Sequence, residues 1–304
     1  MNKYTVKITQ TLDHCITASD FPGKKYVGKV RDVYDQGDNL LLVTTDRLTA
    51  FDRYLTSIPF KGIVLNQISA WWFAKTKHII ANHVIAVPAP DALLAKKCKI
   101  FPLEFIVRGY ITGSTDTSLW THYAKGMREY CGHQLPEGLI KNQKLSTPLL
   151  TPTTKSDVHD EPLSAHEIIT QKLMSQKDWD LVSATALRMF TYASEIAAQQ
   201  GLILVDTKYE FGKDAMGNII IADELHTPDS SRYWRTASYA QRLAAGEEPD
   251  NFDKEIIRLW YKKNCDPYQD KVLLEAPKEL RIKVAERYID LYEALTGREF
   301  EWAV

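Results

Sequence analysis

Residues 201–224, with the sequence GLILVDTKYEFGKDAMGNIIIADE, contain the strand on which the interpretation of the whole chain depends. Residues 202–205 form a continuous apolar run, which is typical of a strand buried on both faces. Three ionisable residues follow at every second position, namely Asp206, Lys208 and Glu210. Because successive side chains of a strand point to opposite faces, these three are expected on one face. Charge at the end of a buried strand is costly unless a ligand, an ion or a partner uses it.

The same stretch is expected to fold back as a hairpin. A turn containing Gly217 precedes the apolar residues 219–222 and then Asp223. A turn centred between residues 216 and 217 places Glu210 directly opposite Asp223, and moving the centre back by one residue makes them diagonal neighbours. Two carboxylates that meet in this way supply the oxygen ligands that Mg²⁺ prefers. The plainer alternative is an exposed strand face with a surface salt bridge.

Two further segments carry candidate anion-binding residues. Arg108 ends an apolar stretch, and the small residues that follow it at 109–115 have backbone amides that can approach a phosphate. The sequence TPDSS at 227–231 is typical of a turn. Arg232 directly follows that turn and offers a planar fork to a phosphate or a carboxylate. An ordinary polar turn would have the same composition, so neither segment is specific alone.

Strands are expected mainly in the first hundred residues and helices mainly after them. A strand over 24–35 would place the side chains of Lys29 and Arg31 on one face. Ser164 and Glu167 match a capping box, so a helix is expected to begin there. The other predicted strands lie at 39–45, 83–87 and 98–108, and a loop-rich segment is expected at 129–162. Three further helices are expected: one over 64–80, one that ends at 201, and one from 277 to 297.

The composition limits the class of protein. The chain has 304 residues, 44% of them hydrophobic, and its 38 basic and 39 acidic residues give a net charge of −1. These values argue against a disordered chain and against a general nucleic-acid binder, which needs a basic excess. The four cysteines form no CxxC pair, so neither a zinc site nor a disulfide framework is expected. With no signal-like or membrane-spanning apolar run, a cytoplasmic protein is expected.

Six segments occur in the order seen in one family. They are GKVRDVYD at 28–35, TTDRLTAFD at 44–52, PLEFIVRGYITGS at 102–114, TPTTK at 151–155, LVDTKYEFG at 204–212 and DELHTPDSSRYW at 223–234. Together they make the chain resemble the SAICAR synthetase family, also called phosphoribosylaminoimidazole-succinocarboxamide synthase, in its longer type of roughly 300 residues. The resemblance implies a two-lobed α+β fold. A β-rich nucleotide-binding lobe at 1–102 would face a larger α/β lobe at 103–304 that carries the substrate and metal sites, with the cleft between them.

The resemblance also implies a reaction of de novo purine biosynthesis. ATP drives amide formation between L-aspartate and the 4-carboxylate of carboxyaminoimidazole ribonucleotide (CAIR), giving SAICAR, ADP and phosphate. A carboxylate is a poor electrophile, so an acyl phosphate is the plausible intermediate, and its formation needs positioning and charge neutralisation. Mg²⁺ and ATP are therefore implied, with small-molecule partners and neither nucleic acid nor membrane. The oligomeric state stays open, and a monomer is compatible with the sequence.

The family pattern suggests roles for individual residues. The residues expected to contact ATP are Lys29, Lys99, Ile100, Phe101 and Lys155, and those expected to bind CAIR are Asp52, Arg108, Ser114 and Arg232. The pair expected to hold Mg²⁺ is Glu210 and Asp223, and the residues expected to take part in catalysis are Lys208 and Asp206. The loop with Asp157, His159 and Asp160 is considered for aspartate.

Two other functions fit parts of this pattern. A small-molecule kinase on a related scaffold would use the same acidic pair and lysines, although the Gly-rich loop and HRD motif of protein kinases are missing. A non-catalytic binding module would keep the scaffold but lose metal or phosphate ligands. ADP release that does not require aspartate would favour the kinase.

Overall fold

The computed structural model describes residues 2–115, 118–155 and 160–302. Its helices are α1 (Thr5–Thr11), α2 (Lys61–Thr76), α3 (Leu119–Ala124), α4 (Ala165–Thr170), α5 (Gln176–Gln199), α6 (Thr236–Ala244), α7 (Glu255–Asn264) and α8 (Lys278–Thr296). Its strands are β1 (Lys24–Val27), β2 (Arg31–Gln36), β3 (Asn39–Thr44), β4 (Arg47–Ala50), β5 (Arg53–Ser57), β6 (Val84–Ala89), β7 (Ala92–Lys96), β8 (Lys99–Ile100), β9 (Leu103–Ile111), β10 (Glu129–Tyr130), β11 (His133–Gln134), β12 (Gln143–Leu150), β13 (Thr153–Thr154), β14 (Leu202–Lys213), β15 (Ile219–Ala222) and β16 (Ser231–Arg235).

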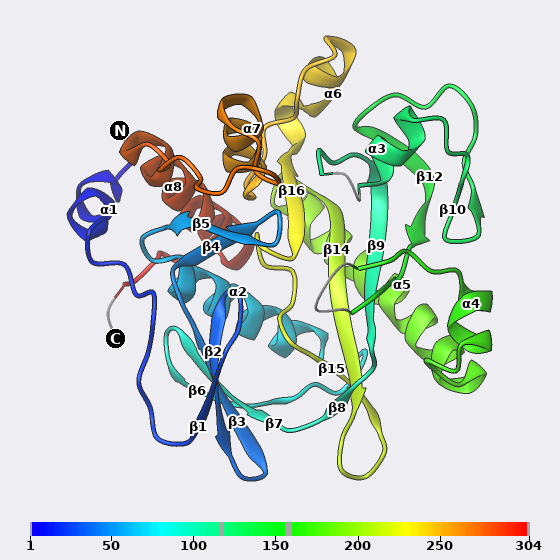
Figure 1. The fold of residues 1–304 in the computed structure, drawn as a ribbon, viewed down its shortest axis with the longest axis horizontal. Coiled ribbons are helices and arrows are strands. Elements are labelled where there is room, and N and C mark those ends of the chain that lie inside the picture. The colour runs from blue at the N-terminus through cyan, green and yellow to red at the C-terminus, as the bar shows by residue number, and fades with distance from the viewer. Residues whose placement is uncertain (1, 116–117, 156–159, 303–304) are drawn as a thin grey trace.

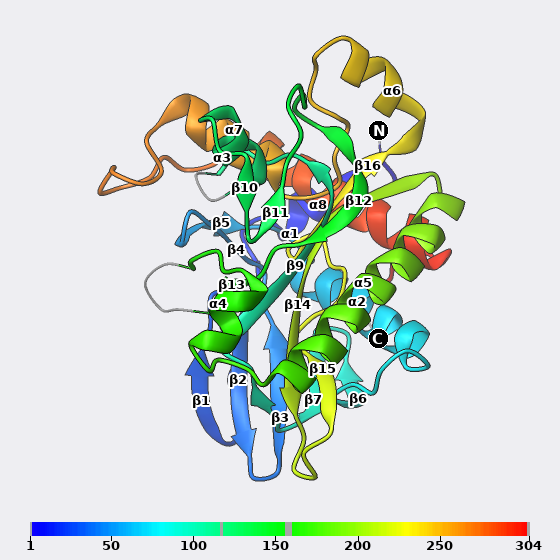
Figure 2. The ribbon, with the colours of Figure 1, turned by 90° about the vertical axis from the view of Figure 1, so that its right-hand side faces the viewer.

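Two antiparallel sheets organise these elements, which gives the α+β class predicted from the sequence. The first has the order β1-β2-β3-β7-β6, and the second has the order β12-β9-β14-β15 with β13 on β9 and with β8 and β16 on β14. The long strands β9 and β14 run side by side through the middle of the molecule (Figure 1). Helix α5 packs against both of them, so one face of this sheet is covered (Figure 2).

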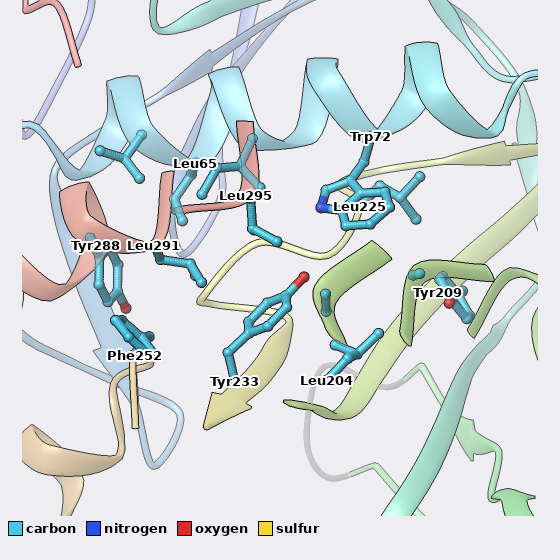
Figure 3. Packing of buried hydrophobic residues seen from close by; sticks show 14 of the residues in the cluster. Leu65, Trp72, Leu204, Tyr209, Leu225, Tyr233, Phe252, Tyr288, Leu291 and Leu295 are labelled. Atoms are coloured by element: carbon cyan, nitrogen blue, oxygen red, sulfur yellow. The ribbon is translucent and has the colours of Figure 1, made fainter. Parts of the chain in front are cut away.

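Helix α2 joins the two sheets into one core. It contacts β3 and β7 of the first sheet and also packs against α8. Trp72 of α2 is fully buried and faces Leu225 and Tyr233, which belong to the second half of the chain (Figure 3). Because α2 is apolar on nearly all sides, it can be buried between layers, as helices of this composition are.

The predicted strand over 24–35 is wrong in its middle. The chain turns at 28–30, and the two halves pair with each other as β1 and β2, from Lys24 opposite Asp35 to Val27 opposite Asp32. The amide of Gly28 donates to the carbonyl of Arg31 at 2.8 Å and closes the turn. Lys29 therefore lies in a turn and does not share a strand face with Arg31.

The predictions for residues 83–162 are incomplete. The strand expected at 83–87 is present as β6 and that at 98–108 as β8 and β9, but β6 pairs with β7, which was not predicted, and β9 pairs with β12 and β14. The segment 129–162 is loop-rich as predicted, but it also contains the strands β10 to β13. Pro148 lies within β12 where the pairing register shifts, a position at which proline is tolerated.

The remaining local predictions are confirmed. Ser164 and Glu167 form the capping box at the start of α4. Helix α5 ends next to Gly201, and α8 lies between Pro277 and Gly297. Helix α2 begins three residues earlier than predicted. Over the described ranges, every helix is too short or too polar to cross a membrane.

Candidate functional site

The charged side chains of β14 engage partners on the side of the sheet opposite its core. Asp206, Lys208 and Glu210 alternate with Tyr209 and Phe211, whose side chains are fully buried in the core. Within the hairpin, Glu210 pairs with Ala222, so the turn is shifted slightly from the centre that would place Glu210 opposite Asp223. Asp223 follows β15 with a left-handed φ of 67°. The observed register lies between the two predicted ones, and Asp223 is one residue beyond the strand partner of Glu210.

Lys208 connects these two carboxylates. Its Nζ lies 2.8 Å from Oε1 of Glu210 and 2.9 Å from Oδ2 of Asp223, and it lies 3.5 Å from Oε1 of Glu104. The other oxygen of Glu210 accepts from Lys155, and the other oxygen of Asp223 accepts from Arg31. We call these six side chains the acidic cluster.

Burial and ion pairing act in opposite directions on the pKa values of Asp223 and Lys208 in the acidic cluster. Burial raises the pKa of Asp223, but Arg31 and Lys208 outweigh it and hold that pKa well below its usual range. Burial lowers the pKa of Lys208, yet Asp223, Glu210 and Glu104 together raise it well above its ordinary value. Burial also raises the pKa of Glu104. Desolvation is therefore offset by mutual attraction, an arrangement typical of sites that bind charged ligands.

Glu210 and Asp223 also fit the predicted Mg²⁺ site in their chemistry. Their four carboxylate oxygens are hard ligands, and each now accepts from a cationic nitrogen, so positive charge already occupies the place that the metal would take. The Lys155 side chain is 47% exposed, so it can leave Glu210 readily. Among the described residues no group of three or more potential ligands gathers. Water and phosphate oxygens would complete the coordination, as is usual for Mg²⁺.

A second cluster surrounds Asp206, which lies four residues before Glu210 on β14. Its carboxylate lies 2.6 Å from Nη1 of Arg232 and 3.9 Å from Nη1 of Arg108. Burial lowers the pKa of Arg232, but Asp206 and Glu255 outweigh it and raise that pKa above its ordinary value. We call Arg108, Asp206 and Arg232 the arginine cluster. Its two guanidinium groups provide forks suited to a phosphate.

The loop after β9 approaches this cluster closely. At Gly113, which has a φ of 109°, an added Cβ would lie 2.4 Å from Cβ of Ser118 and 3.4 Å from Nη2 of Arg232. Only glycine fits there. The carbonyl of the next residue, Ser114, accepts from Nζ of Lys262 at 2.5 Å.

One pocket, of about 350 Å³, is lined by five of the thirteen predicted site residues. It is lined by Lys29, Arg108, Asp206, Lys208 and Arg232, together with residues that sequence reasoning missed. Asp52 is not among the lining residues, but its carboxylate is 2.5 Å from Nζ of Lys29, which is, and we refer to this exposed ion pair as the mouth of the pocket.

The predicted adenine contacts lie elsewhere. Lys99, Ile100 and Phe101 line another pocket, of about 530 Å³, beside the start of α5 and Lys213. Since Lys213 and Glu210 are three positions apart on β14, their side chains point to opposite faces. Asp157 and His159, considered for aspartate, lie outside the described residues. Asp160 is exposed.

Sequence reasoning missed several residues of the pocket of about 350 Å³. Glu104, Asp229, Lys254 and Arg258 all line it. The spacing of four residues between Lys254 and Arg258, at the start of α7, is the signal that could have suggested a basic helix face there. Burial lowers the pKa of Lys254 to about 8, against the opposing effect of Asp229.

Beneath the pocket, Asp229 is held by a fully buried lysine. Nζ of Lys61 lies 2.8 Å from Oδ2 of Asp229, and the hydroxyl of Tyr288 donates to Oδ1 at 2.7 Å. Burial raises the pKa of Asp229, but Lys254 and Lys61 outweigh it and hold the pKa below its usual range. No sequence signal distinguished Lys61, which begins an apolar helix.

Comparisons with known proteins agree with one another. The model of the SAICAR synthetase family matches residues 24–274. A phosphoribosylaminoimidazole-succinocarboxamide synthase of Legionella pneumophila (strain Lens) is 60% identical over 287 residues, which is 94% of this chain and 92% of that protein. A SAICAR synthase from Saccharomyces cerevisiae complexed with SAICAR has a TM-score of 0.80 at 33% identity, over 94% of this chain and 99% of that one. A SAICAR synthetase in complex with ADP has a TM-score of 0.70 at 25% identity, over 92% and 100%.

Proposed function

The chain belongs to the SAICAR synthetase family, and on this premise we propose how its residues divide the reaction between them. It is a carbon–nitrogen ligase of purine biosynthesis, which joins L-aspartate to the 4-carboxylate of CAIR with ATP as co-substrate and yields SAICAR, ADP and phosphate. The observation that carries the division of roles is the pair of clusters on β14, one rich in carboxylates and one rich in guanidinium groups, in adjoining positions.

The acidic cluster is our candidate for the phosphoryl-transfer end. Glu210 and Asp223 would hold Mg²⁺, which when bound supplies charge neutralisation for the ATP phosphates. Lys29 and Lys155 would contact the same phosphates, since both side chains are exposed enough to reach a ligand. Lys208 would stay protonated beside the CAIR carboxylate and reduce the charge repulsion between that carboxylate and the incoming phosphoryl group.

The arginine cluster is our candidate for the ribonucleotide end. Arg108, Arg232 and Ser114 would bind the CAIR phosphate, and Asp52 would contact CAIR from the mouth of the pocket. Asp206 would act between the two ends, because it orients both guanidinium groups while lying two positions from Lys208.

The chemical route that suits this arrangement has two steps. An oxygen of the CAIR carboxylate attacks the γ-phosphorus of ATP, the bond to the bridging oxygen breaks, and ADP leaves. The uncharged amino group of aspartate then attacks the acyl carbon, the carbon–oxygen bond to phosphate breaks, and the nitrogen loses a proton as the amide forms. Both steps need positioned cations more than a covalent nucleophile of the protein.

Three coarser assignments complete the proposal. The lobe at 1–102 would bind the nucleotide, with the backbone at Lys99, Ile100 and Phe101 next to the adenine, and the lobe at 103–304 would carry the substrate and metal sites. The enzyme would work in the cytoplasm.

An omission assay tests the reaction directly. ADP release is measured with CAIR, L-aspartate, ATP and Mg²⁺, and each component is left out in turn. We expect rapid ADP release only with all four present, and SAICAR formed in equal amount. Sustained ADP release without aspartate would instead favour a small-molecule kinase, and activity unchanged by chelation of divalent cations would remove Mg²⁺ from the proposal.

A further inference from the structure

The turn between β4 and β5 has an unusual backbone for its sequence. Ala50 pairs with Arg53 across the hairpin, so Phe51 and Asp52 are the whole turn, and both have left-handed φ values, of 55° and 56°. Such turns are normally made by Asn-Gly or Gly-Gly, because glycine adopts positive φ without steric cost. Two residues with Cβ atoms keep this conformation only where their surroundings impose it.

Both side chains of the turn are engaged. The ring of Phe51 packs edge-on against that of Tyr268, with centroids 5.3 Å apart and an interplanar angle of 77°. The carboxylate of Asp52 pairs with Lys29, which lies in the turn between β1 and β2 and lines the substrate pocket. The turn therefore presents one anchoring side chain and one side chain at the mouth of the pocket.

Arg53, the residue after the turn, binds the loop between α7 and α8. Its guanidinium group donates to the carbonyls of Pro267 at 3.2 Å, Asp270 at 2.6 Å and Lys271 at 3.1 Å. This loop runs along the β4–β5 hairpin in both views of the ribbon (Figures 1 and 2). A single planar fork satisfies three backbone acceptors, which the ammonium group of lysine cannot match in the same geometry.

Helix α7 extends this connection to the ribonucleotide end. Nζ of Lys254 donates to the carbonyl of Thr49 on β4 at 3.1 Å, and the hydroxyl of Tyr261 donates to the carbonyl of Leu55 on β5 at 3.0 Å. Lys262, one residue further, donates to the carbonyl of Ser114. The helix thus touches both strands of the hairpin and also the loop assigned to CAIR.

We propose that Arg53 is a positioning residue that fixes the β4–β5 turn to the α7–α8 loop and so holds Asp52 in place relative to the CAIR-binding loop. Neither Arg53 nor Asp52 is among the described residues that line this pocket, but Asp52 pairs with Lys29, which is. The guanidinium group of Arg53 donates to carbonyls of the α7–α8 loop, so its effect on CAIR passes through the turn that carries Asp52. This inference rests on the proposed contact between Asp52 and CAIR.

A double-mutant cycle tests the inference. The variants are Arg53→Ala, Asp52→Asn and the two together, with kcat and KM for CAIR measured at saturating ATP and aspartate. We expect each single change to lower kcat/KM for CAIR about tenfold, as misplacement of a positioning group does. In the Asp52→Asn background, Arg53→Ala should cost less than about twofold further, because its effect passes through the same carboxylate. Arg53→Lys should fall between, since lysine retains part of the carbonyl contacts.

The controls separate positioning from general damage. Arg128 also donates to two backbone carbonyls, those of Tyr123 at 2.9 Å and Met127 at 3.0 Å, and its removal should leave kcat/KM unchanged. If Arg53→Ala does not fold, Arg53→Lys takes its place in the cycle. Two results overturn the inference alone. One is that Asp52→Asn lowers kcat/KM for CAIR but the losses from Asp52→Asn and Arg53→Ala are fully additive in the double variant. The other is that the Arg53 variant leaves kcat/KM unchanged. A neutral Asp52→Asn overturns both the CAIR role of Asp52 and the inference.

Discussion

The substrate pocket has one ion pair at its mouth and another beneath it, and the two differ mainly in burial. Lys29 and Asp52 lie 2.5 Å apart with side chains 66% and 67% exposed, whereas Lys61 and Asp229 lie 2.8 Å apart with side chains 0% and 3% exposed. Water and salt screen the mouth pair, so it contributes little to stability and can exchange its partner for a ligand. Removing either residue of the buried pair leaves a buried charge without its nearest counter-charge, and for Asp229 only the more distant Lys254 remains. The same kind of ion pair therefore stabilises the fold in one place and, in our proposal, contacts the substrate in the other.

The largest expected effect comes from breaking the buried pair. Lys61→Met leaves Asp229 with only Tyr288 and the more distant Lys254, whose Nζ is 3.9 Å away. We expect the free energy of unfolding to fall by about 3–5 kcal/mol, the cost of an uncompensated buried charge. Chemical denaturation at pH 7 measures it, and Lys29→Met is the matched control.

That control should unfold at the same denaturant concentration as the parent, because the mouth pair is exposed. Equal losses in the two variants would show that burial does not distinguish the pairs.

The acidic cluster combines features of both pairs, and Glu210→Gln tests which feature dominates. Glu210 is buried, yet one of its two partners, Lys155, is half exposed. We expect kcat to fall about a hundredfold, the scale of losing one preorganised charge in an active site, with the fold retained. Steady-state ADP release over a range of Mg²⁺ concentrations, together with circular dichroism, measures both. Turnover near that of the parent would remove Glu210 from the proposed metal site.

Arg232 sharpens the comparison at the other end of the pocket. Arg232→Ala removes a charged fork from the arginine cluster, so we expect KM for CAIR to rise on the order of thirtyfold while KM for ATP changes less than about twofold. Arg232→Lys should not restore the parent value, because an ammonium group does not reproduce the planar fork. Steady-state kinetics with each substrate varied in turn decide the matter. Equal changes in both KM values would contradict a role specific to CAIR.

The local parts of the fold could be predicted from the sequence, and the long-range pairings could not. The β14–β15 hairpin, the capping box at Ser164 and the stripe of α8 depend on neighbours within a few residues, where turn chemistry and periodicity act. The pairing of β9 with β14 joins residues a hundred positions apart, for example Lys208 with Ile106, and local pattern does not encode it. The strand β7 was missed because Pro88 and Pro90 indicated a gap, although β6 is an edge strand that tolerates proline.

The candidate site divides in the same way. Asp206, Lys208 and Glu210 could be assigned to one face from their spacing alone, and the structure gathers partners around each of them. Arg31 and Lys61 could not be given their partners, because each reaches a carboxylate that lies more than 150 positions away in the chain. Buried cations of this kind look like surface residues until the tertiary structure is known.

The smallest effect that we predict extends the contrast between buried and exposed groups to the histidines. Burial lowers the pKa of His226 to about 3 and that of His83 to about 4, so both stay neutral in the folded protein at mildly acidic pH. In the unfolded chain each gains a proton as the pH falls below about 6.5. Each should therefore lower the free energy of unfolding by about 1 kcal/mol between pH 7 and pH 5.5.

The pH dependence of the parent does not isolate this effect, because buried carboxyl groups oppose it. Burial raises the pKa of Asp253 to about 7 and that of Asp46 to about 6, so protonation on acidification favours the folded state at these two groups. The difference between variants does isolate it. Denaturation at both pH values should show that His226→Gln destabilises the protein less at pH 5.5 than at pH 7, by about 1 kcal/mol. The control variant His14→Gln, at an exposed position, should change the denaturation midpoint by the same amount at both pH values. An equal loss at both pH values in His226→Gln would mean that His226 takes up its proton in the folded state too, which its burial against Trp72 should prevent.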